Sequence, residues 1–423
     1  HILIELSGQG PTYSIMIALF KKYFLYSILL SHLAMAGHPL TDYLLKPTGK
    51  YGVSFKDLHW VNDAVCPDPN FSEKREKDFT LDNKKHCHEL MVRIYYPVRL
   101  KDYGGVPYYP PIIYAEQNIL KTKPGVKPED IEKLSLLKSH TTENAPIVKK
   151  AQFPVVLFIS GLGGVVQLYE NLITELVSQG YIVVGINSVF VNGDILLPNN
   201  RIVSMVDPQS WDVVTQKTIP ILERDIAFVY KRIHDTAQDD VFKSMDLHHI
   251  GALGHSFGGR AIANAANHHE KWFQALVTFD MEVHMGSFES KNAIPAMHFI
   301  SAYWRSMFPW FNLHYRLNKN GFLVTLSPNK NEKHYSYHMN FTDFSTLQYM
   351  PAYQASMKSD QAKRVHQNFG NYLGKGNGVQ ITKAINRYLI DFFNVFLKDK
   401  KNSFSDCSSL TNNTYIKCGP GIF

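Results

Sequence analysis

Gly254-His255-Ser256-Phe257-Gly258-Gly259 follows a short apolar run, residues 249–253, and opens a stretch of small residues, 260–266. This order predicts a strand, a sharp turn at a glycine-flanked serine and then a helix. The glycines let strand and helix pass closely while Ser256 adopts a strained backbone angle. Such a turn exposes the serine oxygen in front of a helix N-terminus. We therefore interpret Ser256 as a nucleophile, with a buried serine in an ordinary turn as the alternative.

Outward from this turn, apolar runs alternate with helical patterns. We expect strands over the ranges 153–159, 181–186, 275–279, 295–300 and 321–326, and helices over 168–180, 223–233 and 381–397. A continuous apolar run such as 153–159 is typical of a strand buried on both faces of a parallel sheet. The alternation predicts a doubly wound, mainly parallel sheet with helices on both faces.

Other stretches flank this pattern. Residues 89–97 alternate as in a strand stopped by proline, and two such strands would form an antiparallel edge. We interpret residues 99–150 as a long surface excursion, either a lid or a plain insertion, and residues 187–212 as a second long loop.

The composition narrows the function classes. The chain has 423 residues, 45% of them hydrophobic, and a net charge of 44 − 37 = +7 without a long basic block. These features disfavour nucleic acid as a partner. They favour either weak peripheral contact with anionic lipid surfaces or a plainly soluble basic protein.

The chain divides into three predicted parts. Residues 16–36 combine a basic start, a short apolar run and Ala34-Met-Ala36, which predict a signal peptide; an uncleaved anchor is the alternative. Residues 37–400 form the folded domain, and residues 401–423 form a polar tail. The expected location is secreted or periplasmic.

Four cysteines agree with export. The simplest of three connectivities pairs Cys66 with Cys87 and Cys407 with Cys418, which would tie down the tail. We interpret His86-Cys87-His88 as structural because neighbouring residues on a strand face opposite ways and no Cys-x-x-Cys accompanies them. No metal or cofactor is expected, and the loop 160–164 lacks the spacing of a phosphate-binding loop.

A nucleophilic serine needs a histidine base and a carboxylate, which follow it in the chain in the order acid, then histidine. Asp280 comes directly after the strand 275–279 and is the expected acid; Glu282 and Glu289 compete but end no strand. Among nineteen histidines, His338 and then His334 are the candidate bases, because each lies in a loop after the last expected strand. The other histidines that we weighed are His298, expected in the core, and His284 and His314, expected in loops.

An oxyanion hole needs two backbone N–H groups. We expect one from Phe257, directly after the nucleophile, and the other from Leu162 in the glycine-rich loop Ser160-Gly-Leu-Gly-Gly164.

With these residues, the chain resembles the secreted, plasma-type platelet-activating-factor acetylhydrolases, serine esterases of the α/β-hydrolase fold. The resemblance spans roughly residues 47–350, and its stretches are 48–53 with Asp57, 93–97, 153–164, 169–184, 254–259, Asp280 and 338–344. The family has a similar His-x-Asn-Phe-x-Asp-Phe motif around its base, which favours His338 over His334. Its oxyanion donors correspond to Leu162 and Phe257. Where the family usually has His-Gly-Leu-Gly, this chain has Ser160-Gly-Leu-Gly.

The resemblance implies a metal-independent esterase that cleaves short or oxidised acyl chains from phospholipids. A general lipase, carboxylesterase or polyester hydrolase is the first alternative, and a non-catalytic binding protein is the second. The aromatic segment 303–311 is either a lipid-facing patch or, as we favour, pocket wall or core. We expect the glycosylation sequence at Asn340 to be unused, because a glycan there would crowd His338.

Overall fold

The computed structural model describes the greater part of the chain. The described residues are 43–66, 68, 87–99, 105–106, 137–149, 151–193, 195–198, 201–203, 205, 211–235, 239–269, 271–281, 294–307, 321–328, 332–349, 373–400 and 415–418. The signal peptide expected at residues 16–36 lies outside them. Within the described residues, no helix has the length and apolar character needed to cross a membrane.

Most strands of the structure form one large sheet. The strands are β1 (Gly52–Asn62), β2 (His88–Val98), β3 (Thr142–Glu143), β4 (Phe153–Ile159), β5 (Ile182–Ser188), β6 (Ile195–Leu197), β7 (Arg201–Val203), β8 (Met245–His255), β9 (Ala275–Phe279), β10 (Ala296–Ser301), β11 (Gly321–Leu326) and β12 (Tyr415–Cys418). The helices are η4 (Val166–Tyr169), α4 (Glu170–Ser178), α5 (Trp211–Asp235), α6 (Asp240–Lys243), α7 (Phe257–His268), α8 (Ala302–Met307), η6 (His338–Phe341), α10 (Phe344–Leu347) and α13 (Gly378–Lys398).

The strand order in the sheet is β12-β11-β10-β9-β8-β4-β5-β2-β1-β3. Strands β4, β5, β8, β9, β10 and β11 run parallel to one another, while β2 is antiparallel to β5 and β1 is antiparallel to β2. This confirms the mainly parallel sheet and its antiparallel edge. Strand β2 continues one residue beyond Pro97; its pairing with β5 has already ended at Tyr95, so the missing N–H of the proline removes no bond on that side.

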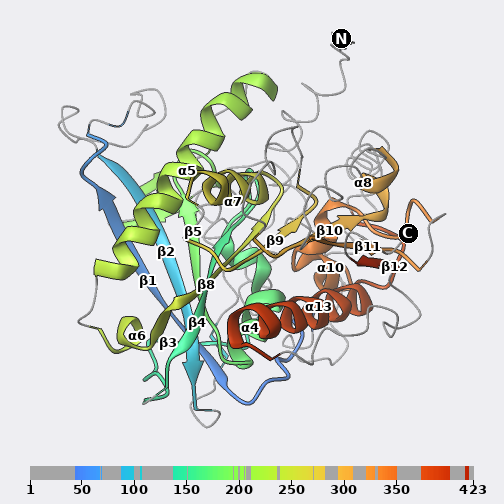
Figure 1. Ribbon diagram of the computed structural model, residues 1–423, viewed down its shortest axis with the longest axis horizontal. Helices are drawn as coiled ribbons and strands as arrows, with labels where there is room; N and C mark the ends of the chain where they lie inside the picture. The colour runs from blue at the N-terminus through green and yellow to red at the C-terminus, as the bar shows by residue number, and fades with distance from the viewer. Residues whose placement is uncertain are drawn as a thin grey trace.

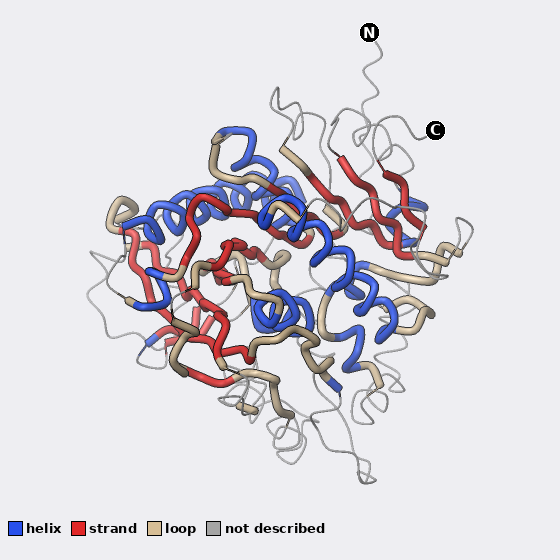
Figure 2. The backbone as a smooth tube through the Cα atoms, turned by 60° about the horizontal axis from the view of Figure 1, so that its bottom comes forward, coloured by secondary structure: helices blue, strands red, loops and turns tan. Residues whose placement is uncertain are grey.

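Helices cover both faces of the sheet, as expected. Strand β4 shows how: Val156 and Phe158 join one apolar cluster with residues of α4 and α13, whereas Val155 and Leu157 join a second cluster with residues of α5 and α7. Figure 1 shows α5 and α7 together on one side and α4 and α13 together on the other, and Figure 2 shows the twisted layer of strands between them. The doubly wound sheet is confirmed.

Two expectations about the middle of the chain are wrong. Helix α5 begins at Trp211 rather than at Glu223, and it contains Pro220. It continues past the proline because Ile219 and Leu222 are buried in the cluster with α7, and this packing outweighs the hydrogen bond that proline removes. The expected loop 187–212 contains the antiparallel hairpin β6–β7.

The described part of the excursion 99–150 is bound to the body of the protein. Residues 142–143 form β3 at the edge of the sheet, and Ser139 is buried with its hydroxyl on the carboxylate of Glu170. Most of residues 100–136, on which the choice between lid and insertion depends, lies outside the described residues.

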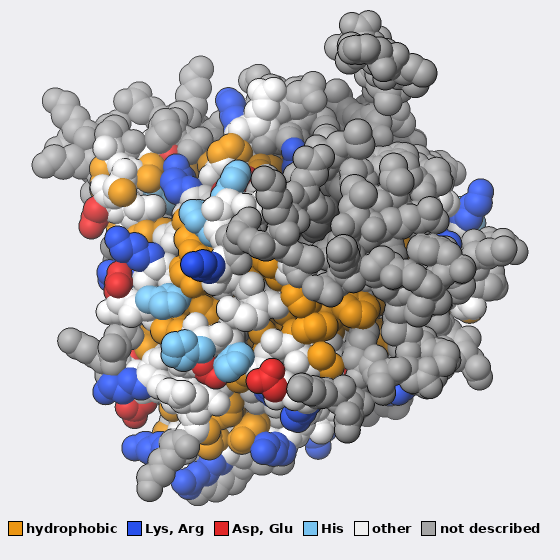
Figure 3. Space-filling view, viewed as in Figure 1, with side chains coloured by type: hydrophobic (Ala, Val, Ile, Leu, Met, Phe, Trp, Pro, Cys, Tyr) orange, Lys and Arg blue, Asp and Glu red, His pale blue; other side chains and the backbone are white. Residues whose placement is uncertain are grey.

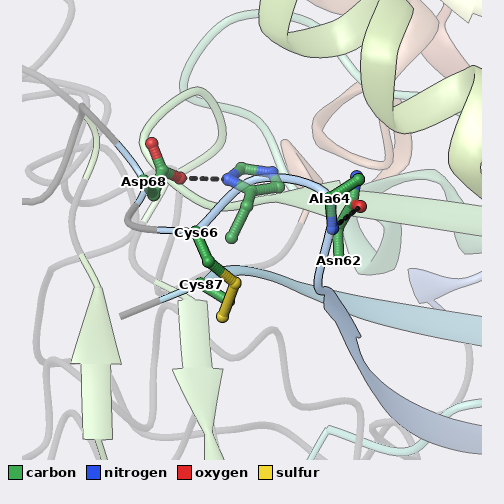
Figure 4. Close-up of a disulfide and its surroundings, with 6 residues drawn as sticks. Asn62, Ala64, Cys66, Asp68 and Cys87 are labelled. Carbon is green, nitrogen blue, oxygen red and sulfur yellow. Dashed lines mark hydrogen bonds and ion pairs between the residues drawn. A yellow bond between two sulfur atoms is a disulfide. The ribbon is translucent and has the colours of Figure 1, made fainter. Parts of the chain in front are cut away.

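The cysteine pairing is confirmed at one of its two places. Cys66 and Cys87 form a disulfide that joins the segment after β1 to the segment before β2 (Figure 4). Cys407 lies outside the described residues. The tail has a further attachment that its composition did not indicate: β12 pairs antiparallel with β11.

Candidate active site

The candidate site lies where the parallel strands end. Ile159 of β4 pairs with Gly254 of β8, and His255 of β8 pairs with Phe279 of β9. The residues that follow these strand ends are therefore neighbours at the carboxyl ends of the parallel strands, where open α/β sheets bind their ligands. Ser256 and Asp280, distant in sequence, meet there because of the strand register.

Ser256 forms the sharp turn that its flanking glycines predict. Its backbone has φ 53° and ψ −120°, a region that non-glycine residues rarely occupy, and its N–H donates to the Phe279 carbonyl at 2.8 Å. A Cβ on Gly258 would lie 2.3 Å from the Ile159 carbonyl oxygen, and one on Gly254 would lie 2.5 Å from the backbone of Gly258. Only glycine allows strand and helix to approach this closely.

Asp280 and His338 contact each other. His338 Nδ1 lies 3.3 Å from Asp280 Oδ2, and the other oxygen of Asp280 accepts the Ser301 N–H at 2.6 Å. The Asp280 side chain is fully buried, whereas that of His338 is 24% exposed. Asp280 also has a positive φ of 38°. A buried carboxylate held by a backbone donor is suited to orienting an imidazole that stays accessible to a ligand.

Two further rings contact the His338 imidazole. The ring of His255 lies 4.4 Å away between centroids, and the ring of Trp304 stacks at 5.3 Å with an interplanar angle of 27°. Trp304 belongs to the aromatic segment 303–311, so this part of the segment lines the candidate site, as the interpretation as pocket wall or core expected. Residues 308–311 lie outside the described residues.

His255 is neutral in this environment. Complete burial lowers the pKa of His255 well below its usual value, and the neighbouring His338 lowers it further. Its Nδ1 lies 2.8 Å from the hydroxyl of Tyr169, which also accepts the Gly161 N–H at 3.4 Å. Tyr169 therefore connects the serine turn with the glycine-rich loop.

The segment that carries His338 is held by its own polar residues. The Asn340 side chain is buried; its oxygen accepts the N–H groups of Tyr337 and Gly374, and its nitrogen donates to Ser345. An amide bonded in this way has no room for a glycan, which supports the expectation that Asn340 is not glycosylated.

Asp343 attaches the same segment to helix α4. Its two carboxylate oxygens accept the N–H groups of Glu170 and Asn171, in the first turn of that helix, at 2.8 and 2.9 Å. A carboxylate at this position bonds unpaired N–H groups and interacts favourably with the helix dipole. The sequence motif around the base thus contains both the histidine and the residues that hold its loop.

The glycine-rich loop after β4 lies against Ser256. A Cβ on Gly161 would lie 3.2 Å from Ser256 Cβ, which places Leu162 in the next position of this loop beside the serine turn. Gly163, with φ 70°, donates its N–H to the Val191 carbonyl at 3.0 Å. Phe257 is the first residue of α7. Both expected oxyanion donors therefore belong to segments that meet at Ser256, and their roles remain predictions.

The structure describes only some of the residues that were weighed as alternatives to Asp280 and His338. His298 is a core residue, as expected: it contacts the Thr278 hydroxyl at 2.7 Å, and burial lowers the pKa of His298 to about 4. His334 hydrogen-bonds the hydroxyl of Tyr337. The remaining competitors, Glu282, Glu289, His284 and His314, lie outside the described residues.

Other histidines lie at the end of the sheet where the parallel strands begin, away from Ser256. His248 and His249 are near the start of β8. His268 is the last residue of α7 and His269 follows it, so that all four lie seven or more residues from Ser256 along the chain. His248, His249, His268 and His269 are therefore too far along their elements to serve Ser256. Figure 3 shows several histidine side chains on the face of the molecule seen in that view.

His88 is structural, as interpreted from its neighbours. Its Nδ1 hydrogen-bonds Asp68 and its Nε2 lies 2.9 Å from Asp225, all three side chains being fully buried. Burial alone would lower the pKa of His88, but Asp225 and Asp68 outweigh it and raise the value to about 9. Among the described residues, Asp63, Cys66 and Cys87 form the one group with metal-binding spacing, and its two cysteines are joined as a disulfide.

Comparison with known proteins agrees with this fold. Residues 74–188 match the family model of platelet-activating factor acetylhydrolase, isoform II. Among solved structures, a ferulic acid esterase from Streptomyces cinnamoneus superposes with a TM-score of 0.65 at 17% identity, covering 88% of this chain and 98% of that chain. The comparison with curated proteins gave no match. The α/β-hydrolase fold is thereby confirmed, and the predicted resemblance is confirmed over residues 74–188.

Proposed function

We propose that this chain is a serine esterase that hydrolyses short or oxidised acyl esters of phospholipids through an acyl-enzyme. The observation that carries the proposal is the contact between buried Asp280 and accessible His338, beside the strained turn of Ser256. Serine, acid and histidine occur in the chain order of α/β-hydrolases, on the loops that this fold uses for catalysis.

In the proposed mechanism, Ser256 attacks the ester carbonyl while His338 takes the proton from its hydroxyl. Asp280 holds the Nδ1–H tautomer of His338 and stabilises the imidazolium that forms. His338 then returns the proton to the departing alcohol, which leaves Ser256 acylated. Water, deprotonated by the same histidine, releases the acid and restores the serine.

The oxyanion of each tetrahedral intermediate would accept hydrogen bonds from the N–H groups of Leu162 and Phe257. Phe257 begins α7, so the helix dipole adds to the stabilisation at that point. No metal is required for any of these steps.

The family match supports an acetylhydrolase-like substrate, whereas the structural neighbour, a ferulic acid esterase, favours a general carboxylesterase as the second candidate. The Cys66–Cys87 disulfide supports secretion or a periplasmic location, because disulfides persist in oxidising compartments. Peripheral contact with a lipid surface follows from the proposed substrate.

Hydrolysis of p-nitrophenyl esters of increasing acyl length, by the full chain and by Ser256→Ala, tests the proposal. We expect rapid cleavage of acetate and butyrate that declines with longer chains and is abolished by the substitution. A maximum at long chains or on feruloyl esters would favour a lipase or carboxylesterase with the same catalytic residues. Activity that survives in Ser256→Ala, or no activity on any ester, would refute the catalytic assignment.

A further inference from the structure

Asn192 lies in the turn after β5, directly behind the glycine-rich loop that begins at Ser160. Its side chain is fully buried. The side-chain oxygen accepts the N–H of Ser188, which fixes the turn itself. The side-chain nitrogen is thereby directed at the neighbouring loop.

The nitrogen of Asn192 makes two contacts with that loop. It donates to the Ser160 hydroxyl at 2.9 Å and to the Gly161 carbonyl at 3.4 Å. The Ser160 hydroxyl in turn donates to the Gly164 carbonyl at 3.1 Å. The Ser160 side chain therefore links the first residue of the loop to the last. Next to Asn192, the Val191 carbonyl accepts the Gly163 N–H at 3.0 Å.

We propose that Asn192, acting through Ser160, is a positioning residue for the oxyanion hole. This inference rests on the proposed function, in which the Leu162 N–H binds the oxyanion. These bonds hold the loop on both sides of Leu162, at residues 160, 161, 163 and 164. Those from outside the loop come from Asn192 and Val191, which are about thirty residues away in sequence. Asn192 and Ser160 set the direction of the Leu162 N–H without touching the substrate.

The physical reason is preorganisation. A backbone donor stabilises a transition state only if it already points at the site where charge develops, because reorienting it during the reaction costs the energy that it would supply. A glycine-rich loop has many accessible backbone conformations, so it needs bonds from outside to keep one of them. A displacement of about 1 Å at such a site costs on the order of 100-fold in rate.

The test compares Ser160→Ala, Asn192→Ala and the double variant with the unaltered chain on p-nitrophenyl butyrate. Ser178→Ala is the matched control, since Ser178 is also fully buried, donates to a carbonyl (Glu175, 2.8 Å) and accepts an N–H (Gly49, 3.0 Å), but lies at the far end of α4. Measured quantities are kcat, KM, the melting temperature and the inhibition constant of a trifluoromethyl ketone, whose adduct with serine carries the oxyanion.

We expect kcat to fall about 10-fold or more in Ser160→Ala and Asn192→Ala with KM nearly unchanged, which is the signature of an interaction made only in the transition state. The inhibition constant of the ketone should rise by the same factor as kcat/KM falls. Because both residues belong to one network, the double variant should lose little more than the worse single variant. Ser178→Ala should lower the melting temperature without changing kcat.

Three outcomes would overturn the inference: an unchanged kcat in Ser160→Ala, a loss confined to KM, or a kcat loss in Ser178→Ala equal to that in Ser160→Ala. If Asn192→Ala does not fold, Ser160→Ala alone decides, because it removes one hydroxyl and leaves the turn at Ser188 intact. Ser256→Ala is measured in parallel. Activity that survives there refutes the proposed function, whereas activity lost there but retained in Ser160→Ala refutes only the role of Asn192.

Discussion

The imidazole of His255 packs on the imidazole of His338, with 4.4 Å between ring centroids. His255 is completely buried and its pKa is well below the usual value, so the ring that supports the candidate base carries no charge at neutral pH. A second cation there would oppose protonation of His338 during catalysis. A neutral ring supports the base without this cost.

Replacing His255 tests this support. We expect His255→Ala to lower kcat by about 10-fold or more, since it removes the ring contact and leaves a cavity beside His338. His255→Phe keeps a ring in place and should retain more activity, although it loses the bond to Tyr169. Steady-state kinetics of the two variants, with their melting temperatures, makes the comparison. Equal losses of kcat would contradict a role for the ring contact.

Asp280→Asn should leave the fold intact and abolish most of the activity. Asparagine can still accept the Ser301 N–H, but it cannot stabilise an imidazolium at His338. By analogy with other triads, kcat should fall by a factor on the order of 1,000 or more. Circular dichroism establishes the fold and ester hydrolysis measures the loss. A variant within 10-fold of the unaltered chain would show that another residue is the acid.

Gly258→Ala should destabilise the protein more than Gly259→Ala. The added methyl group at position 258 would lie 2.3 and 2.5 Å from the carbonyl oxygens of Ile159 and Ser160, whereas at position 259 its closest neighbour would be 3.0 Å away. We expect a loss of about 3 kcal/mol or more in the free energy of unfolding for Gly258→Ala. Urea unfolding of both variants measures the difference, and the reverse order would argue against this backbone geometry.

Glu170 makes the stability of the protein depend on pH. Burial raises the pKa of Glu170 to about 8, and the charge of Asp343 adds to the effect. The folded protein therefore keeps a proton that the unfolded chain releases near pH 4.5, so this group's contribution to stability is complete below pH 4.5 and declines until about pH 8. The loss is at most about 1.4 kcal/mol for each pH unit in that window.

Glu170→Gln removes this dependence, because the amide resembles the protonated acid and can still accept the Ser139 hydroxyl. We expect the variant to be more stable than the unaltered chain at pH 8 and nearly equal to it at pH 4.5. Urea unfolding at several pH values gives both curves. Parallel curves would mean that Glu170 is ionised in the folded protein at neutral pH.

The sequence predicted the strands well where burial on both faces leaves a clear signal. Residues 153–159, 275–279 and 321–326 are strands with the expected bounds, because a continuous apolar run between polar turns has few other solutions in a parallel sheet. The beginning of α5 and the pairing of β12 were not predicted, since packing overrides Pro220 in one case and the partner strand is remote in the other.

The site was predictable to a similar degree. The order of residues and the strand ends indicated Ser256 and Asp280 but left both His338 and His334 as bases, and only the resemblance favoured His338. The structure brings the segments that carry Ser256, Asp280 and His338 to one end of the sheet, and their catalytic roles remain predictions. Asn192 could not be found in this way, and Trp304 was indicated only as one member of the aromatic segment 303–311. An asparagine in a long loop and a tryptophan in an aromatic stretch have no local pattern, and their contacts arise only once remote segments meet.

Asp343 links the candidate active site to the thermal stability of the protein. Asp343, which holds the His338 segment, also accepts the first N–H groups of helix α4. Ser345 of the same segment donates to the Gly378 carbonyl at the start of α13. The hydrogen bonds that hold the segment of the candidate base, His338, are therefore the same ones that attach it to α4 and α13. We infer that heat inactivates this protein by the same event that unfolds it, so that residual activity serves as a gauge of the folded fraction.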